Sequence, residues 1–296
     1  MPVPETDAII RIHSDTLSAE INSFGAELHR LQDVDGRDLL WNGDPAFWTG
    51  RAPILFPVIG CVAGGVIRVD GQEYPMPKHG FARHKSFAVV EQAADHATFR
   101  LEPDDETRAA YPFEFRLDIR FTLDGGALSI EARLFNPADT SLPASFGFHP
   151  ALRWPLPWGA ARADHRIRFE APEPAPIRRI DSAGLLRPQP EPTPVRGHDL
   201  QPDDALFVDD ALIFDQLASR RLTYGAPDSP SLHIAFPAMP LLGVWTKPGA
   251  GFLCIEPWQG IADPEGFTGQ FRDKPGVIEV PPRSSHIFAL HITIAA

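Results

Sequence analysis

The sequence predicts an all-β protein, a large antiparallel β-sandwich, on three observations. Apolar and polar residues alternate over many short runs, which is the pattern of strands with one buried face. The chain contains 32 prolines and 23 glycines, and these separate the runs as turns and loops would. Helical periodicity appears nowhere at length. At 296 residues the chain fits one β domain spanning 1–296.

The clearest strands form a hairpin, because every second residue of 115–123 and 128–134 is apolar. The intervening Asp-Gly-Gly at 124–126 supplies the turn, since Asp and Gly accept positive φ. A second Asp-Gly turn joins 66–69 to 72–74 in the same way. Further strands are expected at 8–13, 97–101, 232–236, 252–256 and 286–294.

Prolines are densest at 172–194. Because strand patterns resume afterwards, this segment is interpreted as a long surface excursion with partly polyproline character, not as a linker between domains. In the resulting sandwich we expect both faces of the larger sheet to contribute to a concave site.

Composition narrows the class of function. A formal charge of −12 would repel a phosphate backbone, so nucleic-acid binding is not expected, and a small-molecule partner fits better. No stretch approaches the ~18 apolar residues of a membrane helix, and the N-terminus lacks a signal-peptide pattern, so we expect a cytoplasmic protein without a membrane partner. Cys61 and Cys254 lie far apart and are expected to be free thiols.

Two ionisable residues end apolar runs directly before a proline. His149 closes 146–149 (FGFH) and Glu256 closes 252–256 (FLCIE). Proline disfavours a continuing ladder, so each strand is predicted to stop just after presenting its side chain. An imidazole and a carboxylate at such positions can give one proton to a substrate and take another. A histidine satisfied by the backbone and a structural ion-pair carboxylate are the alternatives.

Three basic residues share one tight connection at 77–83 (PKHGFAR), namely Lys78, His79 and Arg83. Such a loop can hold a substrate, although charged loops are often only solvated. Asp210 precedes the apolar run 211–214, where a substrate contact and a simple element start are equally compatible with the spacing.

Other chemistries lack their usual signatures. The sequence contains no HExxH, GxSxG, P-loop or GxGxxG pattern, so no cofactor and no metal is expected. Trp154 and Trp258 could stack on a ligand, but each is more often a core residue. A thiol enzyme built on Cys254 is disfavoured because that cysteine lies in an apolar strand.

Taken together, five co-linear motifs resemble the aldose 1-epimerase (galactose mutarotase-like) family, most closely its LacX-like branch. The resemblance runs from about residue 21 to the C-terminus, and its motifs are APILFPVIG at 52–60, HGFAR at 79–83, GFHP at 147–150, DALIF at 210–214 and IEPWQGIAD at 255–263. It implies a large antiparallel β-sandwich that interconverts the anomers of a free aldose without cofactor or metal.

The resemblance also implies roles for individual residues. Glu256 matches the general base that takes the proton of the anomeric hydroxyl, and His149 matches the general acid that protonates the ring oxygen. His79 and Asp210 match substrate-holding positions. Arg83 matches a phosphate contact of hexose-6-phosphate mutarotases. Unperturbed pKa values would leave the carboxyl ionised and, with the carboxylate beside it, the imidazole protonated.

The chain departs from the family pattern at two positions. Cys61 stands where relatives usually carry arginine, and Lys78 replaces a common glutamine, which adds a positive charge beside the pocket.

The resemblance as a whole makes a mutarotase of free hexoses the leading hypothesis. A hexose-6-phosphate mutarotase and a non-catalytic carbohydrate-binding protein are the alternatives, and the sequence leaves sugar identity and oligomeric state open.

Overall fold

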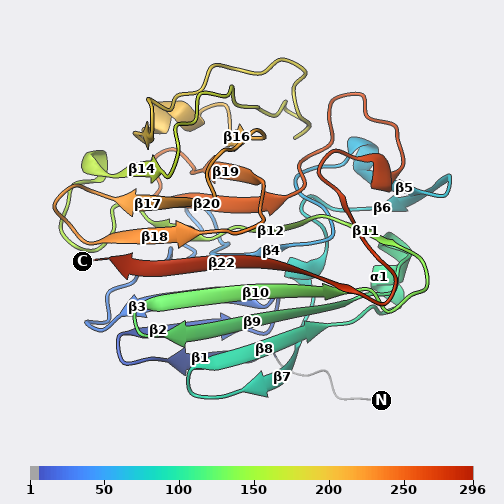
Figure 1. The fold of residues 1–296 in the computed structure, drawn as a ribbon, viewed down its shortest axis with the longest axis horizontal. Helices are drawn as coiled ribbons and strands as arrows, with labels where there is room; N and C mark the ends of the chain where they lie inside the picture. Colours follow the sequence, from blue (N-terminus) through green and yellow to red (C-terminus); the bar gives the residue numbers. More distant parts are fainter. Residues whose placement is uncertain (1–6, 296) are drawn as a thin grey trace.

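A nine-stranded antiparallel sheet forms one layer of the molecule in the computed structural model, which describes residues 7–295 (Figure 1). In spatial order its strands are β15 (Asp199–Leu200), β14 (Arg166–Phe169), β17 (Arg221–Gly225), β18 (Ser231–Ala235), β22 (Ser285–Ala295), β10 (Ala127–Phe135), β9 (Arg116–Asp124), β8 (His96–Leu101) and β7 (Ala88–Gln92). The C-terminal strand β22 thus lies in the middle of the sheet.

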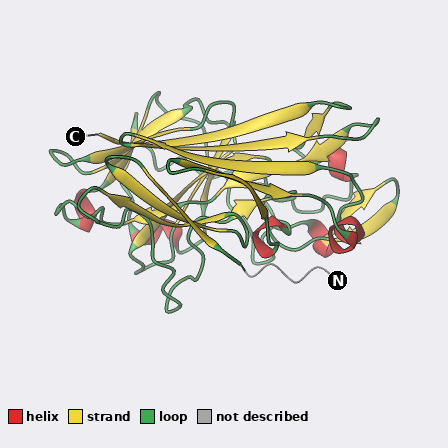
Figure 2. Cartoon of the chain, turned by 90° about the horizontal axis from the view of Figure 1, so that it is seen from below, coloured by secondary structure: helices red, strands yellow, loops and turns green. Residues whose placement is uncertain are grey.

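A six-stranded antiparallel sheet forms the second layer and carries the site described below. Its order is β16 (Leu212–Phe214), β19 (Leu241–Trp245), β20 (Phe252–Gln259), β12 (Phe146–Phe148) and β4 (Ile54–Leu55), and β13 (Ala151–Arg153) also pairs with β20. Figure 2, the view from below, shows that the strands are stacked in layers and do not form one flat sheet.

Three small antiparallel sheets and short helices complete the fold. The sheets are β1 (Ile9–His13), β2 (Leu17–Asn22) and β3 (Glu27–Asp33); β5 (Val66–Val69) and β6 (Gln72–Pro75); and β11 (Leu142–Ala144) and β21 (Ile278–Val280). The helix α1 is Asp105–Ala110, and the 3-10 turns are Ala63–Gly65, Ala82–His84, Arg162–Asp164, Asp204–Phe207 and Phe271–Asp273. The predicted antiparallel β-sandwich is confirmed.

The predicted β9–β10 hairpin shows how local sequence sets this architecture. Asp124 pairs with Ala127, so the connection is the two-residue Gly125-Gly126 turn, and Gly125 has a φ of +50°. Side chains then alternate between the two faces of the sheet along both strands. Leu117, Ile119 and the other apolar residues on the inner face are buried.

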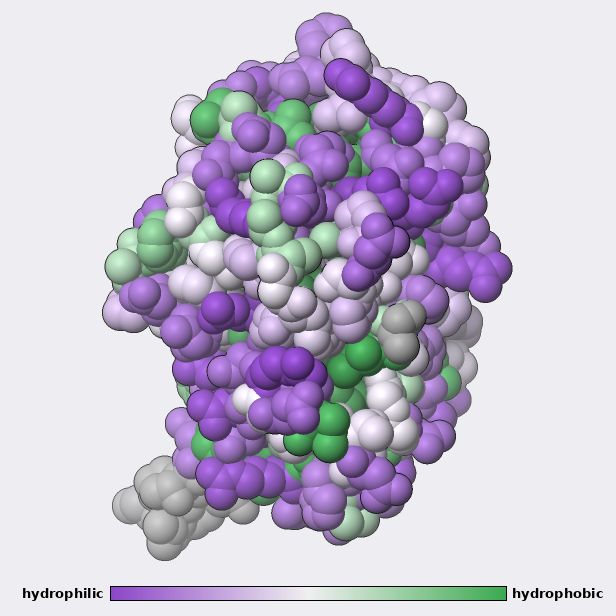
Figure 3. All heavy atoms as spheres, turned by 90° about the vertical axis from the view of Figure 1, so that its left-hand side faces the viewer, coloured by the Kyte–Doolittle hydropathy of each residue, from purple (hydrophilic) through white to green (hydrophobic). Residues whose placement is uncertain are grey.

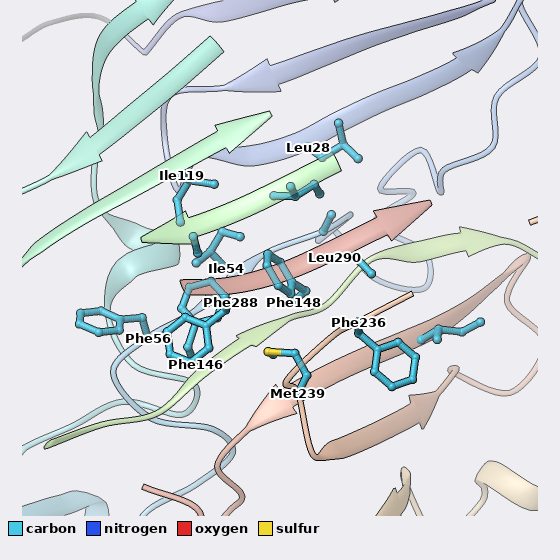
Figure 4. Close-up of a cluster of buried hydrophobic side chains, with 14 of the residues drawn as sticks. Leu28, Ile54, Phe56, Ile119, Phe146, Phe148, Phe236, Met239, Phe288 and Leu290 are labelled. Carbon is cyan, nitrogen blue, oxygen red and sulfur yellow. The ribbon is translucent and has the colours of Figure 1, made fainter. Parts of the chain in front are cut away.

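The main core fills the space between the two large sheets. Phe146 of β12 and Phe288 of β22 stack with ring centroids 4.7 Å apart and an interplanar angle of 12°. Figure 4 shows these rings beside Phe148, Leu290 and Ile54. Aromatic rings in such contact add specific geometry to the burial of apolar area. The six-stranded sheet is therefore held rigidly from behind.

The face of the molecule shown in Figure 3 is predominantly hydrophilic, in keeping with the charge of −12. Within residues 7–295 no helix has the length and apolarity needed to cross a membrane.

Candidate active site

A pocket opens on the face of the six-stranded sheet that points away from the nine-stranded sheet. Its cavity has a volume of about 160 Å³. The side chains and loops that line it are Trp48, Ile59, Gly60, Lys78, His79, Arg83, His149, Ile180, Gly184, Asp210, Ala211, Ile213, Trp245, Glu256, Trp258 and Ala262. None of them belongs to the nine-stranded sheet, so the expectation that the larger sheet contributes to the site is wrong.

His149 and Glu256 meet on the floor of this pocket. The His149 Nε2 and Glu256 Oε2 atoms are 3.1 Å apart, and the two residues are only 8% and 2% exposed. Glu256 reaches the pocket because side chains alternate along β20. Leu253 and Ile255 pack in the main core, whereas Glu256 points to the opposite face.

The strand β20 does not stop at Glu256 as the sequence predicts, because it continues through Pro257 to Gln259. The interruption lies instead on the neighbouring side, between β12 and β13. Residues 252–254 pair with β13 and residues 258–259 pair with β12, which leaves 255–257 opposite the gap between β12 and β13. That gap accommodates a proline, which lacks an N–H. It is also where His149 leaves the ladder and turns toward Glu256.

Unperturbed groups would give an ionised Glu256 and a protonated His149. Burial shifts both pKa values in the direction that favours the neutral groups. Desolvation lowers the pKa of His149 to about 3. Desolvation, followed by the nearby Asp210 carboxylate, raises the pKa of Glu256 well above its ordinary value, while Lys78 and the Trp258 N–H oppose that rise. Burial therefore favours the neutral form of each group, with a shared proton on Glu256 in preference to His149.

His79 presents a fixed tautomer to the pocket. The backbone N–H of Gly60 donates to the ring Nδ1 of His79 at 3.1 Å, and the backbone N–H of His79 donates to the Gly60 carbonyl at 2.8 Å. Burial, and then the neighbouring His149, lowers the pKa of His79 well below its usual value. Because Nδ1 accepts in this neutral ring, Nε2 carries the proton and is a donor.

Tight backbone packing fixes the His79 loop. Gly80 has a φ of +75°, and a Cβ there would lie 2.0 Å from the carbonyl oxygen of Phe56. Gly60 is equally constrained, since its Cβ would lie 2.5 Å from the Cβ of Ala262. The motif that follows Glu256 is thereby packed against the loop that positions His79.

A buried ion pair supports the same region from behind. Lys274 Nζ lies 2.8 Å from Asp263 Oδ1, with side-chain exposures of 1% and 5%. Asp263 Oδ2 also accepts the backbone N–H of Ala63 at 2.8 Å, and the Asp263 N–H donates to the Cys61 carbonyl at 3.0 Å. A second hollow shares Lys78, Ile180, Gly184 and Asp210 with the pocket, and we call it the outer mouth. Cys61 lines this outer mouth beside Gly184.

Lys78 and Arg83 place positive charge at the entrance of the pocket. The Arg83 guanidinium donates through Nη2 to the Lys78 carbonyl at 3.1 Å. Its Nε is buried, and within residues 7–295 no acceptor reaches it in hydrogen-bonding geometry. Lys78 is exposed and lines both the pocket and its outer mouth.

Asp210 also lines the pocket and is held by a residue of the proline-rich segment. The buried Arg179 donates through Nη1 to the carbonyl oxygens of Asp210 and Ala211 at 2.8 and 3.2 Å. Ile180 and Gly184 of the same segment line the pocket. Most residues of the segment 172–194 are exposed or half-buried, as expected of a surface excursion, and the segment also forms a wall of the site. Sequence spacing offered no signal for this packing.

A model of the aldose 1-epimerase family matches residues 8–271. The chain belongs to the aldose 1-epimerase family. The LacX protein encoded on a plasmid of Lactococcus lactis is 31% identical, and the alignment covers 96% of this chain and 99% of that protein. Human galactose mutarotase is 28% identical over 206 residues, which cover 63% of this chain and 58% of that protein.

Solved structures agree with the family assignment. A galactose mutarotase-like protein from Lactobacillus casei is 28% identical with a TM-score of 0.89, and covers 97% of this chain and 100% of its own. A galactose mutarotase related enzyme from Lactobacillus acidophilus is 25% identical with a TM-score of 0.88 and covers 98% of each chain.

Sequence reasoning missed two tryptophans of this aldose 1-epimerase family member. Trp48 lies on a loop, and its ring centroid is 5.0 Å from that of His149 at an interplanar angle of 33°. Trp245 of β19 approaches the same imidazole edge-on at 6.1 Å. Both line the pocket. They shield His149 from water, which contributes to its low pKa. The sequence signal for Trp245 was only the alternation of side chains along β19, which places every second residue on the same face of the sheet.

The donor atoms of His149, Cys254 and Glu256 lie within 4.8 Å of one another, which makes them the one metal-ligand cluster among the residues described. Burial, and then Glu256, raises the pKa of the Cys254 thiol well above its usual range. A protonated thiol is a poor ligand and a poor nucleophile. We therefore assign this cluster no thiol-based role.

Proposed function

We propose that the protein is an aldose 1-epimerase that interconverts the α and β anomers of a free hexose by opening and closing the sugar ring. The observation that carries the proposal is the 3.1 Å approach of His149 Nε2 to Glu256 Oε2 in a buried pocket. One proton shared by an imidazole and a carboxylate can be delivered to one oxygen while another is withdrawn.

The reaction uses the tautomer with the proton on His149 and the charge on Glu256. The Glu256 carboxylate takes the proton of the anomeric hydroxyl, C1=O forms, the C1–O5 bond breaks, and His149 protonates O5. Rotation about C1–C2 and the same steps in reverse close the ring on the other face. Lys78 favours the required carboxylate, since it lowers the pKa of Glu256.

The remaining residues hold the sugar. His79 offers a fixed Nε2–H donor, because its Nδ1 is occupied by Gly60. Asp210 is an acceptor in the same pocket, and Trp48 and Trp245 supply apolar faces of the kind that sugar rings pack against.

Polarimetry of freshly dissolved α-D-glucose tests the proposal. We expect the protein to accelerate the approach to the anomeric equilibrium in proportion to its concentration. A rate equal to that of buffer, with sugar binding demonstrated by calorimetry, would instead support the non-catalytic carbohydrate-binding protein.

A second candidate substrate is a hexose 6-phosphate, favoured by the buried Arg83 Nε that lacks an acceptor among residues 7–295 and by the exposed ammonium of Lys78. A phosphate oxygen would satisfy both charges. On this reading, Arg83→Gln raises KM for glucose 6-phosphate by roughly tenfold and leaves KM for glucose unchanged. Arg11→Gln, on β1 outside the pocket, serves as the control. A KM for glucose 6-phosphate that stays at its wild-type value in Arg83→Gln would remove this candidate.

The pH profile of kcat/KM should be a wide bell. The acid limb reports loss of the first proton from the doubly protonated pair, and with the pKa of His149 lowered to about 3 it lies far below neutrality. The alkaline limb reports loss of the last proton, which the raised pKa of Glu256 moves upward. Initial rates should therefore not fall as the pH is lowered from about 7 to about 5. An acid limb near the ordinary histidine pKa of ~6.5 would contradict the burial argument.

A further inference from the structure

Trp258 lies two positions after Glu256 on β20, so the two side chains share the pocket face of the strand. It is 5% exposed and lines the pocket together with Glu256. In the sequence this tryptophan could be taken for a core residue. Its surroundings indicate a more specific use.

The indole lies in a slot made by two glycines on the flanking strands. Gly147 of β12 pairs with Trp258, and Gly243 of β19 pairs with Glu256. A Cβ on Gly147 would lie 2.7 Å from the indole Cδ1, and a Cβ on Gly243 would lie 2.4 Å from Cζ2. Real Cβ atoms do not approach so closely. Glycine is therefore required at both positions to leave the ring flat across the sheet, beside the carboxyl of Glu256.

The N–H of this indole is the unusual feature. Within residues 7–295, the buried Nε1 of Trp258 has no acceptor in good hydrogen-bonding geometry. Three other indoles of the chain have acceptors, since Trp41, Trp154 and Trp158 donate to Trp48 O, Arg162 O and Asp33 Oδ2 at 2.8, 2.9 and 3.2 Å. A buried donor without a partner is costly, so a nearby group that gains negative charge is its natural acceptor.

We propose that Trp258 is a positioning residue for the proposed epimerase reaction, whose indole N–H, held in the Gly147–Gly243 slot, binds the Glu256 carboxylate whenever the proton moves to His149. The bond stabilises the reactive tautomer of the pair, which burial otherwise disfavours. The N–H already opposes the rise in the pKa of Glu256. The inference rests on the proposed function, and it explains why β12 and β19 both carry glycine against the indole.

Trp258→Phe tests the proposal, because phenylalanine keeps a ring in the slot and removes only the donor. We expect kcat to fall about tenfold with little change in KM, and the alkaline limb of the pH profile to move to higher pH by roughly one unit. Trp158→Phe is the matched control. It removes an N–H that donates to the Asp33 carboxylate at 3.2 Å outside the pocket, and should leave rate and profile unchanged.

A second variant addresses the slot. Gly243→Ala places a methyl group 2.4 Å from the indole carbon Cζ2, so the ring must leave its position in the slot. The same fall in kcat is expected, with thermal unfolding measured to separate it from loss of fold. If Trp258→Phe folds normally and keeps both the wild-type kcat and the wild-type alkaline limb, the indole is only a wall and the inference is overturned. A wild-type protein without epimerase activity would overturn the proposed function instead.

Discussion

Glu256→Gln is expected to lower kcat by about 10²- to 10⁴-fold, since the amide cannot take the proton of the anomeric hydroxyl. Glutamine keeps the size of the side chain and can still bond to His149, so substrate binding should change little. NMR exchange spectroscopy of the glucose anomers measures the effect against the buffer rate.

The same substitution should not destabilise the fold. The pKa of Glu256 is raised on folding, so as pH rises above the unfolded value of 4.5 the unfolded chain releases a proton that the folded protein keeps. This lowers the free energy of unfolding toward higher pH, and glutamine, which does not titrate, removes the penalty. The melting temperature of Glu256→Gln at about pH 8 should equal or exceed that of the wild type.

Glu173→Gln provides the contrasting control. Glu173 is 2% exposed and accepts the backbone N–H groups of Ala218 and Ser219 at 3.0 and 2.8 Å. An amide NH₂ facing these donors costs stability but lies outside the pocket. We therefore expect Glu173→Gln to lower the melting temperature and spare kcat, the reverse of Glu256→Gln. Two variants with the same loss of folding and of rate would make Glu256 a structural carboxylate.

His149→Asn is expected to lower kcat by a similar ~10²- to 10⁴-fold, because asparagine cannot protonate the ring oxygen. Desolvation lowers the pKa of His149 to about 3, so the imidazole is neutral when the protein folds at neutral pH, and a neutral amide should replace it at small cost in stability. His233→Asn, at an exposed position of β18, is the control that should retain full activity. Turnover within a few-fold of wild type in His149→Asn would remove the proposed acid.

Much of the fold could be predicted from local pattern alone. Alternation in 115–123 and 128–134 depends only on which face of a strand is buried, and β9 and β10 follow it. The course of β20 could not be predicted in this way. Pro257 sits inside the strand because β12 and β13 leave a gap beside it, and such a gap is set by partners distant in the sequence.

The candidate site could be predicted only in part, again because local sequence does not contain long-range contacts. Residue types and motif order indicated His149 and Glu256, but the protonation of the pair depends on desolvation by surroundings that no local segment contains. Trp48 and Arg179 come from loops whose packing is decided by long-range contacts. Trp258 could be seen in the sequence, whereas its slot depends on glycines from two other strands.

The double variant Glu256→Gln/His149→Asn tests most directly whether the two residues work as one proton-sharing unit. Groups that act together show strongly non-additive losses. Anomer exchange rates should therefore be elevated for the wild type and equally low for both single variants and the double variant. A double variant whose loss equals the product of the two single losses would show that imidazole and carboxyl act independently, and would contradict the account.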